Sequence, residues 1–291
     1  MTQPSLSSGF RISAVVSDVD GTLLDREKRL TDGTRAAIAE LRKRGIAFVL
    51  ISSRPPRGLR MLLEPLTITT PVAGFNGGAF TTPELAIIEQ HLLSPSVARH
   101  ATDFLTPRGL EVWVFSKNEW LLRALNGSRT NTEKRAVQFM PTLVKDFGNA
   151  LDAANKIVGV SNYYDLIRKS EHEARGLFAD RASVARSQQY YLDFTHLLAN
   201  KGAAVQAISR LLAIPMEQVA VIGDGVNDVA MFEQSPFSIA MGNASSEVRD
   251  RARSVTTSNG DEGFASAIER YVIRPDVTSH SRLRTSIREQ Q

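Results

Sequence analysis

Short apolar runs alternate with amphipathic segments over most of the chain. The runs Ile12–Val16, Ile46–Ile51 and Val219–Ile222 predict buried strands, because each is short, almost entirely apolar and bounded by turn residues. Helical spacing follows the first run from Thr31 to Gly45, where the glycine suits a helix C-terminus. The alternation predicts an α/β fold with a doubly wound parallel-sheet core. Its later units are Lys201–Leu212, Val226–Glu233, Phe237–Ala240 and a final helix from about Asp261 to Tyr271.

The distance between Ser52 and Lys201 predicts a second, inserted domain, since it far exceeds the length of a single crossover. We place an α/β cap domain at 83–189 and the discontinuous core domain at 1–82 and 190–273, and we expect 274–291 to form a mobile tail. Hinge segments are expected near Ala79–Thr82 and Tyr190–Asp193. The cap elements predicted are helices from Ser94 and over Tyr163–Phe178, a polar stretch at Asn126–Lys134, and strands at Val112–Phe115, Trp120–Leu125, Ile157–Ser161, Ala182–Ser187 and Tyr190–Phe194.

Paired carboxylates follow two of the predicted core strands. Asp18 and Asp20 follow the first of these strands, two residues apart, so their side chains project to the same side of the backbone. Asp224 and Asp228 follow the strand Val219–Ile222. Open α/β sheets bind ligands at the edge where their strands end. One carboxylate there can attack a phosphorus while another protonates the departing oxygen. For a single such motif, a polar turn is the alternative interpretation.

Four carboxylates at one sheet edge require neutralisation. A pair of like charges 4 Å apart costs about 4 kcal/mol at an effective dielectric of 20. Either protons are retained or a cation is bound. Oxygen ligands without a nearby Cys or His favour Mg²⁺. A calcium-binding EF-hand loop is excluded, because Gly21 stands at the fourth position counted from Asp18 rather than the sixth and no Glu closes the loop.

Composition narrows the possible partners. The 291 residues, 42% hydrophobic and 23% charged, are enough for two cores. There is no Cys, which excludes disulfides and thiol chemistry and is compatible with the expected cytoplasmic location. Neither a signal peptide nor a membrane span is predicted. The net charge of +4 is scattered, so we expect a basic surface that attracts anionic small molecules, with no nucleic acid and no membrane as partner.

Five motifs occur in a fixed order along the chain. They are Asp18-Val19-Asp20-Gly21-Thr22-Leu23-Leu24, Ser52-Ser53-Arg54-Pro55, Asn76-Gly77, Lys201-Gly202 and Gly223-Asp224-Gly225-Val226-Asn227-Asp228. In this order the sequence resembles the haloacid dehalogenase-like phosphatases, and within them the Cof-like sugar-phosphatase branch. The resemblance runs from about Arg11 to Val272, and Ala240-Met241-Gly242-Asn243-Ala244 is a further match typical of that branch. It implies a large cap that excludes water and selects the substrate.

The resemblance also implies roles for the catalytic residues. Asp18 matches the nucleophile that forms an aspartyl-phosphate intermediate. Asp20 matches the general acid and base, whose backbone carbonyl is expected to bind the metal. Ser52 takes the place of the hydroxyl that binds the phosphoryl oxygens. Lys201 matches the ammonium that neutralises both the phosphate and the nucleophile.

The implied metal is Mg²⁺, with Asp18, Asp20, Asp224 and Asp228 as ligands. The implied substrate contacts are Ser53, Arg54, Asn76, Gly77 and Asn227. Two departures from the family pattern stand out. Ser53 adds a side chain where the family usually has Gly, which narrows the expected pocket, and the loop before Lys201 lacks the usual Pro and Gly.

The expected activity is hydrolysis of small phosphorylated metabolites such as sugar phosphates. A phosphomutase with the same paired aspartates is the alternative, although Gly242-Asn243-Ala244 and the cap layout favour a hydrolase. A cation-pumping ATPase is rejected, because its nucleophile motif has Lys where this chain continues to Asp20 and because it needs membrane helices. Substrate identity depends on cap residues without a recognisable motif. Trp113, Trp120 and Tyr163 either line a pocket or pack the cap, and packing is the favoured interpretation. The five histidines show no metal-binding spacing.

Overall fold

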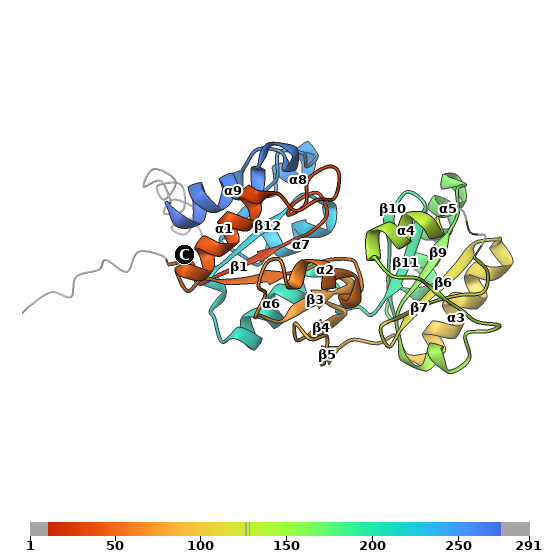
Figure 1. Cartoon of the computed structure of the whole chain (residues 1–291). Coiled ribbons are helices and arrows are strands. Elements are labelled where there is room, and N and C mark those ends of the chain that lie inside the picture. The colour runs from red at the N-terminus through yellow and green to blue at the C-terminus, as the bar shows by residue number, and fades with distance from the viewer. Residues whose placement is uncertain (1–10, 126, 128, 275–291) are drawn as a thin grey trace, which may run out of the picture. The chain divides into compact units, whose positions relative to one another are not determined.

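The computed structural model describes residues 11–125, 127 and 129–274, and its contacts divide them into two compact units (Figure 1). Residues 11–50 and 205–274 form the first unit, and Ile51–Ala204 form the second. The contacts thus group residues 51–82 with the inserted elements, while the cap boundaries at 83 and 189 stay a prediction. The segment before Arg11 and the predicted tail beyond residue 274 lie outside the described residues.

The first unit is built on a parallel sheet of five strands in the order β14-β13-β12-β1-β2. The strands are β1 (Ala14–Ser17), β2 (Ala47–Leu50), β12 (Val219–Gly223), β13 (Phe237–Ala240) and β14 (Ser254–Val255). The three runs that predicted strands are therefore strands, and they lie side by side in the middle and at one end of the sheet. The predicted parallel α/β core is confirmed.

Helices cover this sheet as the right-handed crossover rule requires. From β1 the chain moves to β2 on one side, and from β12 it moves to β13 on the other, so α1 and α7 lie on opposite faces. At the start of α1 the Thr31 hydroxyl accepts a hydrogen bond from the Thr34 N–H, and Gly45 beyond its end has a left-handed φ of +68°. The helices are α1 (Asp32–Lys43), α7 (Val229–Phe232), α8 (Ser246–Arg249), α9 (Gly263–Ala267), which continues as a π-helix over Ile268–Ile273, and α6 (Lys201–Leu212), which begins in the second unit.

The second unit contains two sheets. The larger has six strands in the order β10-β11-β9-β6-β7-β8, antiparallel except for the pair β7–β8. Its strands are β6 (Glu111–Ser116), β7 (Glu119–Leu122), β8 (Thr142–Leu143), β9 (Ala154–Val160), β10 (Ser183–Gln188) and β11 (Tyr191–Thr195). The smaller is antiparallel and consists of β3 (Val72–Gly74), β4 (Ala79–Thr81) and β5 (Ile87–Gln90).

The two faces of the six-stranded sheet bury different side chains. On one face, α3 (Pro95–Leu105) and α5 (Tyr164–Phe178) pack on an aliphatic and phenylalanine core. The other face carries Trp113 and Trp120, both fully buried, with Phe75 from the loop after β3 and Val137 from α4 (Thr130–Val137). The two tryptophans are packing residues, as predicted. Tyr163 is not, since 77% of it is exposed.

One cap segment contains more regular structure than its sequence predicted. The polar stretch Asn126–Lys134 contains the start of helix α4, which buries only Thr130 and Val137 and therefore lacks the apolar stripe that identifies a helix from sequence. The segments expected to be hinges, Ala79–Thr82 and Tyr190–Asp193, lie largely in strands β4 and β11, the second of which was also predicted as a strand. Their hinge role stays a prediction. Strand β4 has only three residues, too few for an alternating pattern to stand out.

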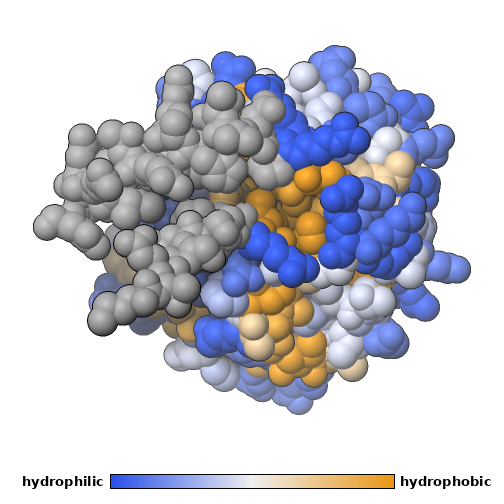
Figure 2. Space-filling view, turned by 90° about the vertical axis from the view of Figure 1, so that its left-hand side faces the viewer, coloured by the Kyte–Doolittle hydropathy of each residue, from blue (hydrophilic) through white to orange (hydrophobic). Residues whose placement is uncertain are grey.

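The face of the molecule in Figure 2 is mainly hydrophilic, with an apolar area among the hydrophilic residues. Exposed apolar side chains of the first unit include Leu211, Val226 and Val255. Among the described residues, no helix combines the length and the apolar character that crossing a membrane requires.

Candidate active site

The first group of predicted site residues lies where β1 and β12 end. These neighbouring parallel strands are paired up to Ser17 and Ile222, and the Asp18 N–H donates to the Ile222 carbonyl at 3.0 Å. The two loops that follow therefore start side by side, as expected for parallel strands. The loop after β1 carries Asp18 and Asp20, and the loop after β12 carries Asp224 and Asp228.

Three carboxylates converge there. Asp18, Asp224 and Asp228 each offer one oxygen, and these three atoms all lie within 4.8 Å of one another. Asp18 and Asp228 are buried and Asp224 is half-buried. Such a set of carboxylate oxygens fits a hard divalent cation such as Mg²⁺. We call these three residues the acidic group. The Asp20 carboxylate is not a member of it, and the expected contribution of the Asp20 backbone carbonyl stays a prediction.

Asp228 organises the loop that contains Asp224. Its Oδ2 accepts hydrogen bonds from the Asp224 N–H at 2.9 Å and from the Gly225 N–H at 2.7 Å. The side chain is completely buried. Charge-assisted hydrogen bonds of this kind are stronger than neutral ones, so Asp228 holds the loop that carries Asp224 in place.

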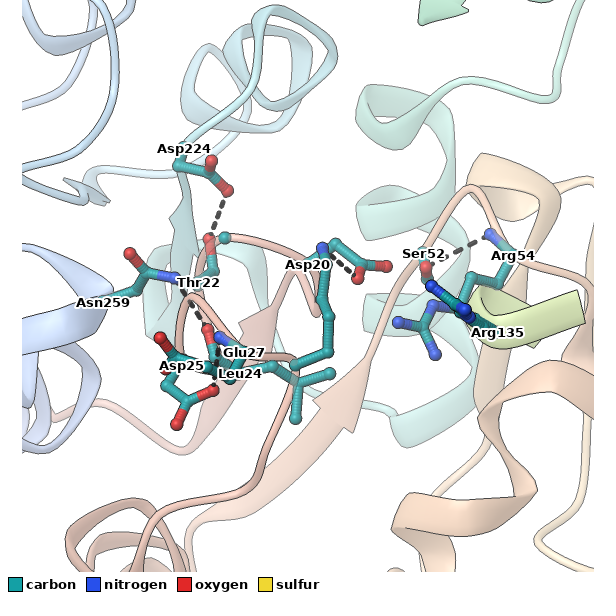
Figure 3. A network of polar contacts seen from close by, with 12 residues as sticks. Asp20, Thr22, Leu24, Asp25, Glu27, Ser52, Arg54, Arg135, Asp224 and Asn259 are labelled. Carbon is teal, nitrogen blue, oxygen red and sulfur yellow. Dashed lines mark hydrogen bonds and ion pairs between the residues drawn. The ribbon is translucent and has the colours of Figure 1, made fainter. Parts of the chain in front are cut away.

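Two residues donate hydrogen bonds to the Asp224 carboxylate. The Thr22 hydroxyl donates to Asp224 Oδ1 at 2.8 Å (Figure 3), and Asn243 Nδ2 donates to Asp224 Oδ2 at 3.2 Å and to the Gly21 carbonyl at 2.9 Å. Gly21 has a φ of +86°, and a Cβ atom there would lie 2.3 Å from Asp224 Oδ2. Only glycine permits this approach. Thr22 and Asn243 belong to motifs noted in the sequence, but their contacts to Asp224 were not foreseen.

Asp20 forms an ion pair that the sequence did not suggest. Lys28 Nζ lies 2.6 Å from Asp20 Oδ1, with 57% of the lysine side chain and 30% of the aspartate side chain exposed. The next residue, Arg29, serves a different carboxylate. Its backbone N–H is the main cause that holds the pKa of Asp25 below its ordinary value. Adjacent basic residues of one loop thus pair with two different aspartates.

The second group of predicted residues lies in the second unit. Ser52 is buried, its Oγ accepts a hydrogen bond from the Arg54 N–H at 3.2 Å (Figure 3), and its carbonyl accepts one from the Asn76 N–H at 2.7 Å. Arg54 is buried as well, and Ser53 is half-buried. The structure thus brings Ser52, Arg54 and Asn76 together.

The turn that contains Asn76 and Gly77 has an uncommon backbone. Phe75, Asn76 and Gly77 have φ values of +52°, +57° and +94°. A Cβ atom on Gly77 would lie 2.4 Å from the Cβ atom of Ala204. Residues other than glycine are held in the left-handed region at a cost of order 1–3 kcal/mol each, and such residues cluster at functional sites.

The remaining predicted residues are Lys201 and Asn227. Lys201 is the first residue of α6, and only 1% of it is exposed. A buried ammonium requires compensating negative charge or hydrogen-bond acceptors, which fits a functional role better than a surface role. Asn227, in the loop after β12, is exposed.

Comparisons with known proteins agree with this arrangement of motifs. The family model of the haloacid dehalogenase-like hydrolases matches residues 15–268. The chain belongs to this family. It is 25% identical to the 5-amino-6-(5-phospho-D-ribitylamino)uracil phosphatase YcsE of Bacillus subtilis over 262 residues, which cover 90% of this chain and 96% of that protein.

Solved structures share the fold. The crystal structure of a haloacid dehalogenase-like hydrolase from Bacteroides thetaiotaomicron superposes with a TM-score of 0.83 at 24% identity, covering 89% of this chain and 99% of that one. A subclass IIB sugar phosphatase of the same superfamily gives a TM-score of 0.77 at 20% identity, covering 88% and 98%. The predicted family and fold are confirmed, and the comparisons support a phosphatase.

Proposed function

We propose that this haloacid dehalogenase-like hydrolase is a Mg²⁺-dependent phosphatase of small phosphorylated metabolites, such as sugar phosphates, and that it acts through an aspartyl-phosphate on Asp18. The observation that carries the proposal is the convergence of Asp18, Asp224 and Asp228 within 4.8 Å, in a chain of this family. The phosphorylated ribitylamino compound named for the Bacillus subtilis relative belongs to the same class of substrate.

The proposed reaction has two steps. An Asp18 oxygen attacks the phosphorus and the bond from phosphorus to the leaving oxygen breaks, while Asp20 gives that oxygen a proton. A water molecule then attacks the phosphorus of the aspartyl-phosphate and gives a proton to Asp20. Phosphate leaves and the Asp18 carboxylate is restored. Lys28, 2.6 Å from Asp20, is placed to hold the orientation of that side chain.

Residues of the second unit are proposed to bind the phosphoryl group. Ser52 and the Asn76–Gly77 turn would donate hydrogen bonds, and Lys201 with Arg54 would supply positive charge. The path of the chain supports this assignment. Strand β2, the neighbour of β1, ends at Leu50, two positions before Ser52, and Lys201 opens the helix that leads back into the first unit. Ser53 and Asn227 are proposed as further substrate contacts.

Asp18, Asp224 and Asp228 would hold Mg²⁺ through their carboxylates and Asp20 through its carbonyl. The ion would supply positive charge against the negative charge of the phosphoryl group. The donor set fits this metal, because it consists of oxygen atoms alone. A cytoplasmic location stays a prediction.

Phosphate release from a panel of phosphomonoesters, with and without Mg²⁺, tests the proposal. The panel holds p-nitrophenyl phosphate, several sugar phosphates and the ribitylamino compound named above. Asp18→Asn should reduce release at least about 10⁴-fold, since it removes the nucleophile. Asp32→Asn, on the exposed first turn of α1, is the matched control and should keep wild-type activity.

Full activity of Asp18→Asn would overturn the assigned nucleophile. Isomerisation of a sugar phosphate that depends on a bisphosphate, without phosphate release, would instead establish a phosphomutase.

A further inference from the structure

A group of polar side chains lies on one face of the six-stranded sheet, opposite the face covered by α3 and α5. Lys156 of β9 belongs to this face because it alternates with Ile157, which packs on the helices. By the same alternation, Tyr191 and Asp193 of the paired strand β11 flank Leu192 and share the face. Glu133 of α4 lies against them. We call Glu133, Lys156, Tyr191 and Asp193 the polar cluster.

Only part of this cluster is satisfied by contacts within the protein. Lys156 Nζ lies 2.6 Å from Asp193 Oδ2, and each side chain is 10% exposed. The other carboxylate oxygen, Asp193 Oδ1, is buried without a hydrogen-bond partner. The Tyr191 hydroxyl is also buried, and it interacts with Glu133. An unmade hydrogen bond such as that of Asp193 Oδ1 costs about 1–3 kcal/mol, so a bound molecule that completes it would be favoured.

Glu133 connects the cluster to the predicted phosphate contacts. Burial raises the pKa of Glu133 and Asp193 adds to the effect, while the charges of Lys156 and Arg54 oppose it. Arg54 is thus near enough to act on Glu133, and its backbone N–H donates to Ser52. Helix α4 packs on the short 3₁₀-helix η1 (Pro56–Leu59), which starts two residues after Arg54. In Figure 3, Arg135 of α4 lies in the part of the view that also holds Ser52 and Arg54.

A purely structural ion pair in the same unit looks different. Glu171 of α5 is buried, and both its carboxylate oxygens are used, Oε1 by Arg175 at 2.8 Å and Oε2 by Arg186 at 2.6 Å. In this structural ion pair, both oxygens of the buried carboxylate therefore have a partner. A structural role for the Lys156–Asp193 pair would explain the 2.6 Å contact but would leave the unpaired Asp193 Oδ1 unexplained.

The geometry points to the polar cluster as the site that binds the part of the substrate beyond its phosphate, selecting a leaving group that carries free hydroxyls and no second anion. This inference rests on the proposed phosphatase function and specifies its substrate class. Asp193 Oδ1 accepts hydrogen bonds, so it needs a donor, which a hydroxyl group supplies. A hydrocarbon leaving group would leave this atom unpaired, and a second phosphate would offer it another acceptor instead of a donor.

Three matched substrates test the inference: a hexitol monophosphate, n-hexyl phosphate, which has the same carbon chain without hydroxyls, and a hexitol bisphosphate. We expect kcat/KM for the hexitol monophosphate to exceed both others by at least about 100-fold. Asp193→Asn should lower that value at least about 30-fold and change n-hexyl phosphate less than about 3-fold. The control Glu171→Gln, which changes a fully paired carboxylate, should leave the ratio between the substrates unchanged.

The double variant Lys156→Met/Asp193→Leu distinguishes a loss of substrate binding from a loss of folding stability. Replacing both partners of a buried pair by apolar residues is often neutral for stability, whereas removing one is not. We expect this variant to keep the wild-type melting temperature and to hydrolyse the hexitol and hexyl esters with similar kcat/KM. A wild-type enzyme without preference, or a preference that both variants retain, overturns the inference.

Failure of the proposed function itself would look different, because p-nitrophenyl phosphate and n-hexyl phosphate would then also release no phosphate. In that case calorimetric binding of the hexitol monophosphate and n-hexyl phosphate to the wild type and Asp193→Asn still decides about the cluster. Tighter binding of the hexitol ester that is lost in the variant supports it, and equal binding overturns it.

Discussion

The acidic group of the first unit and the polar cluster of the second both depend on buried carboxylates, yet their charges are balanced in different ways. The acidic group brings Asp18, Asp224 and Asp228 within 4.8 Å of one another. In the polar cluster, Asp193 is paired with Lys156 at 2.6 Å, and Glu133 lies within the influence of Lys156 and Arg54. The first arrangement favours an added cation. The second contains its own cations and lacks hydrogen-bond partners instead.

This difference separates two tasks of a phosphatase. Carboxylates that repel one another bind a metal, because the ion relieves the repulsion. Carboxylates that are already balanced gain little from an ion, but a neutral molecule with hydroxyl groups can complete their hydrogen bonds. If this interpretation is right, a neutralising substitution in the acidic group and the loss of the cation from the polar cluster should change stability in opposite directions.

The largest effect is expected for Asp224→Asn in the acidic group. Phosphate release in Mg²⁺ should fall at least about 10³-fold, equivalent to about 4 kcal/mol of transition-state stabilisation. In chelator, the melting temperature should equal or exceed that of the wild type, because one of three like charges is gone. Mg²⁺ should raise the melting temperature of the wild type and not that of the variant.

Calorimetry with and without Mg²⁺ measures both stability effects of this variant. A marked loss of stability in chelator would contradict the electrostatic account and would assign Asp224 a mainly structural role. Its hydrogen bonds with Thr22 and Asn243 make that alternative specific.

Lys156→Met is expected to act in the opposite direction on stability. It leaves the buried Asp193 carboxylate without its partner, and breaking a buried pair in this way costs about 3–5 kcal/mol. Thermal unfolding of the variant should show a clear drop in melting temperature. Lys43→Met, which removes an exposed pair with Glu40 at 3.8 Å, should change it little. Equal melting temperatures of the two variants would mean that Lys156 and Asp193 are not coupled.

The acidic group could be predicted from sequence and the polar cluster could not, for a physical reason. Asp18 and Asp224 each stand one residue beyond an apolar run, and the parallel register of β1 and β12 follows from alternating strands and helices. Glu133 and Asp193 come from elements far apart in the chain. They meet through the pairing of β9 with β11 and through α4, a helix without an apolar stripe. Lys28 was missed for a similar reason, since nothing in a loop sequence shows which aspartate a lysine will meet.

A smaller effect should appear in the pH dependence of stability at Glu133. Burial raises the pKa of this carboxyl above its ordinary value of 4.5. The folded protein then holds a proton that the unfolded chain has lost, so wild-type stability falls as the pH rises above 4.5 until the raised pKa is passed. Glu133→Gln removes this loss. The melting temperature of Glu133→Gln minus that of the wild type should therefore increase by a few degrees between pH 4.5 and pH 8. If this difference stays constant over that range, Glu133 is ionised in the folded protein throughout.

The smallest effect is expected for Lys28→Met. The pair with Asp20 is partly exposed, and such pairs contribute about 0.2–1 kcal/mol, which corresponds to at most about a 5-fold change in kcat/KM. If Lys28 positions Asp20, the loss should concern esters of poor leaving groups, such as a hexitol monophosphate, and spare p-nitrophenyl phosphate, whose leaving group departs without a proton. Lys28→Arg should restore activity, and Arg29→Met, which affects the pair with Asp25 instead, should change neither substrate. Equal losses of kcat/KM for both esters would show that Lys28 acts on the loop as a whole and does not position Asp20. Catalysis in the first unit would then depend on the carboxylates without help from Lys28.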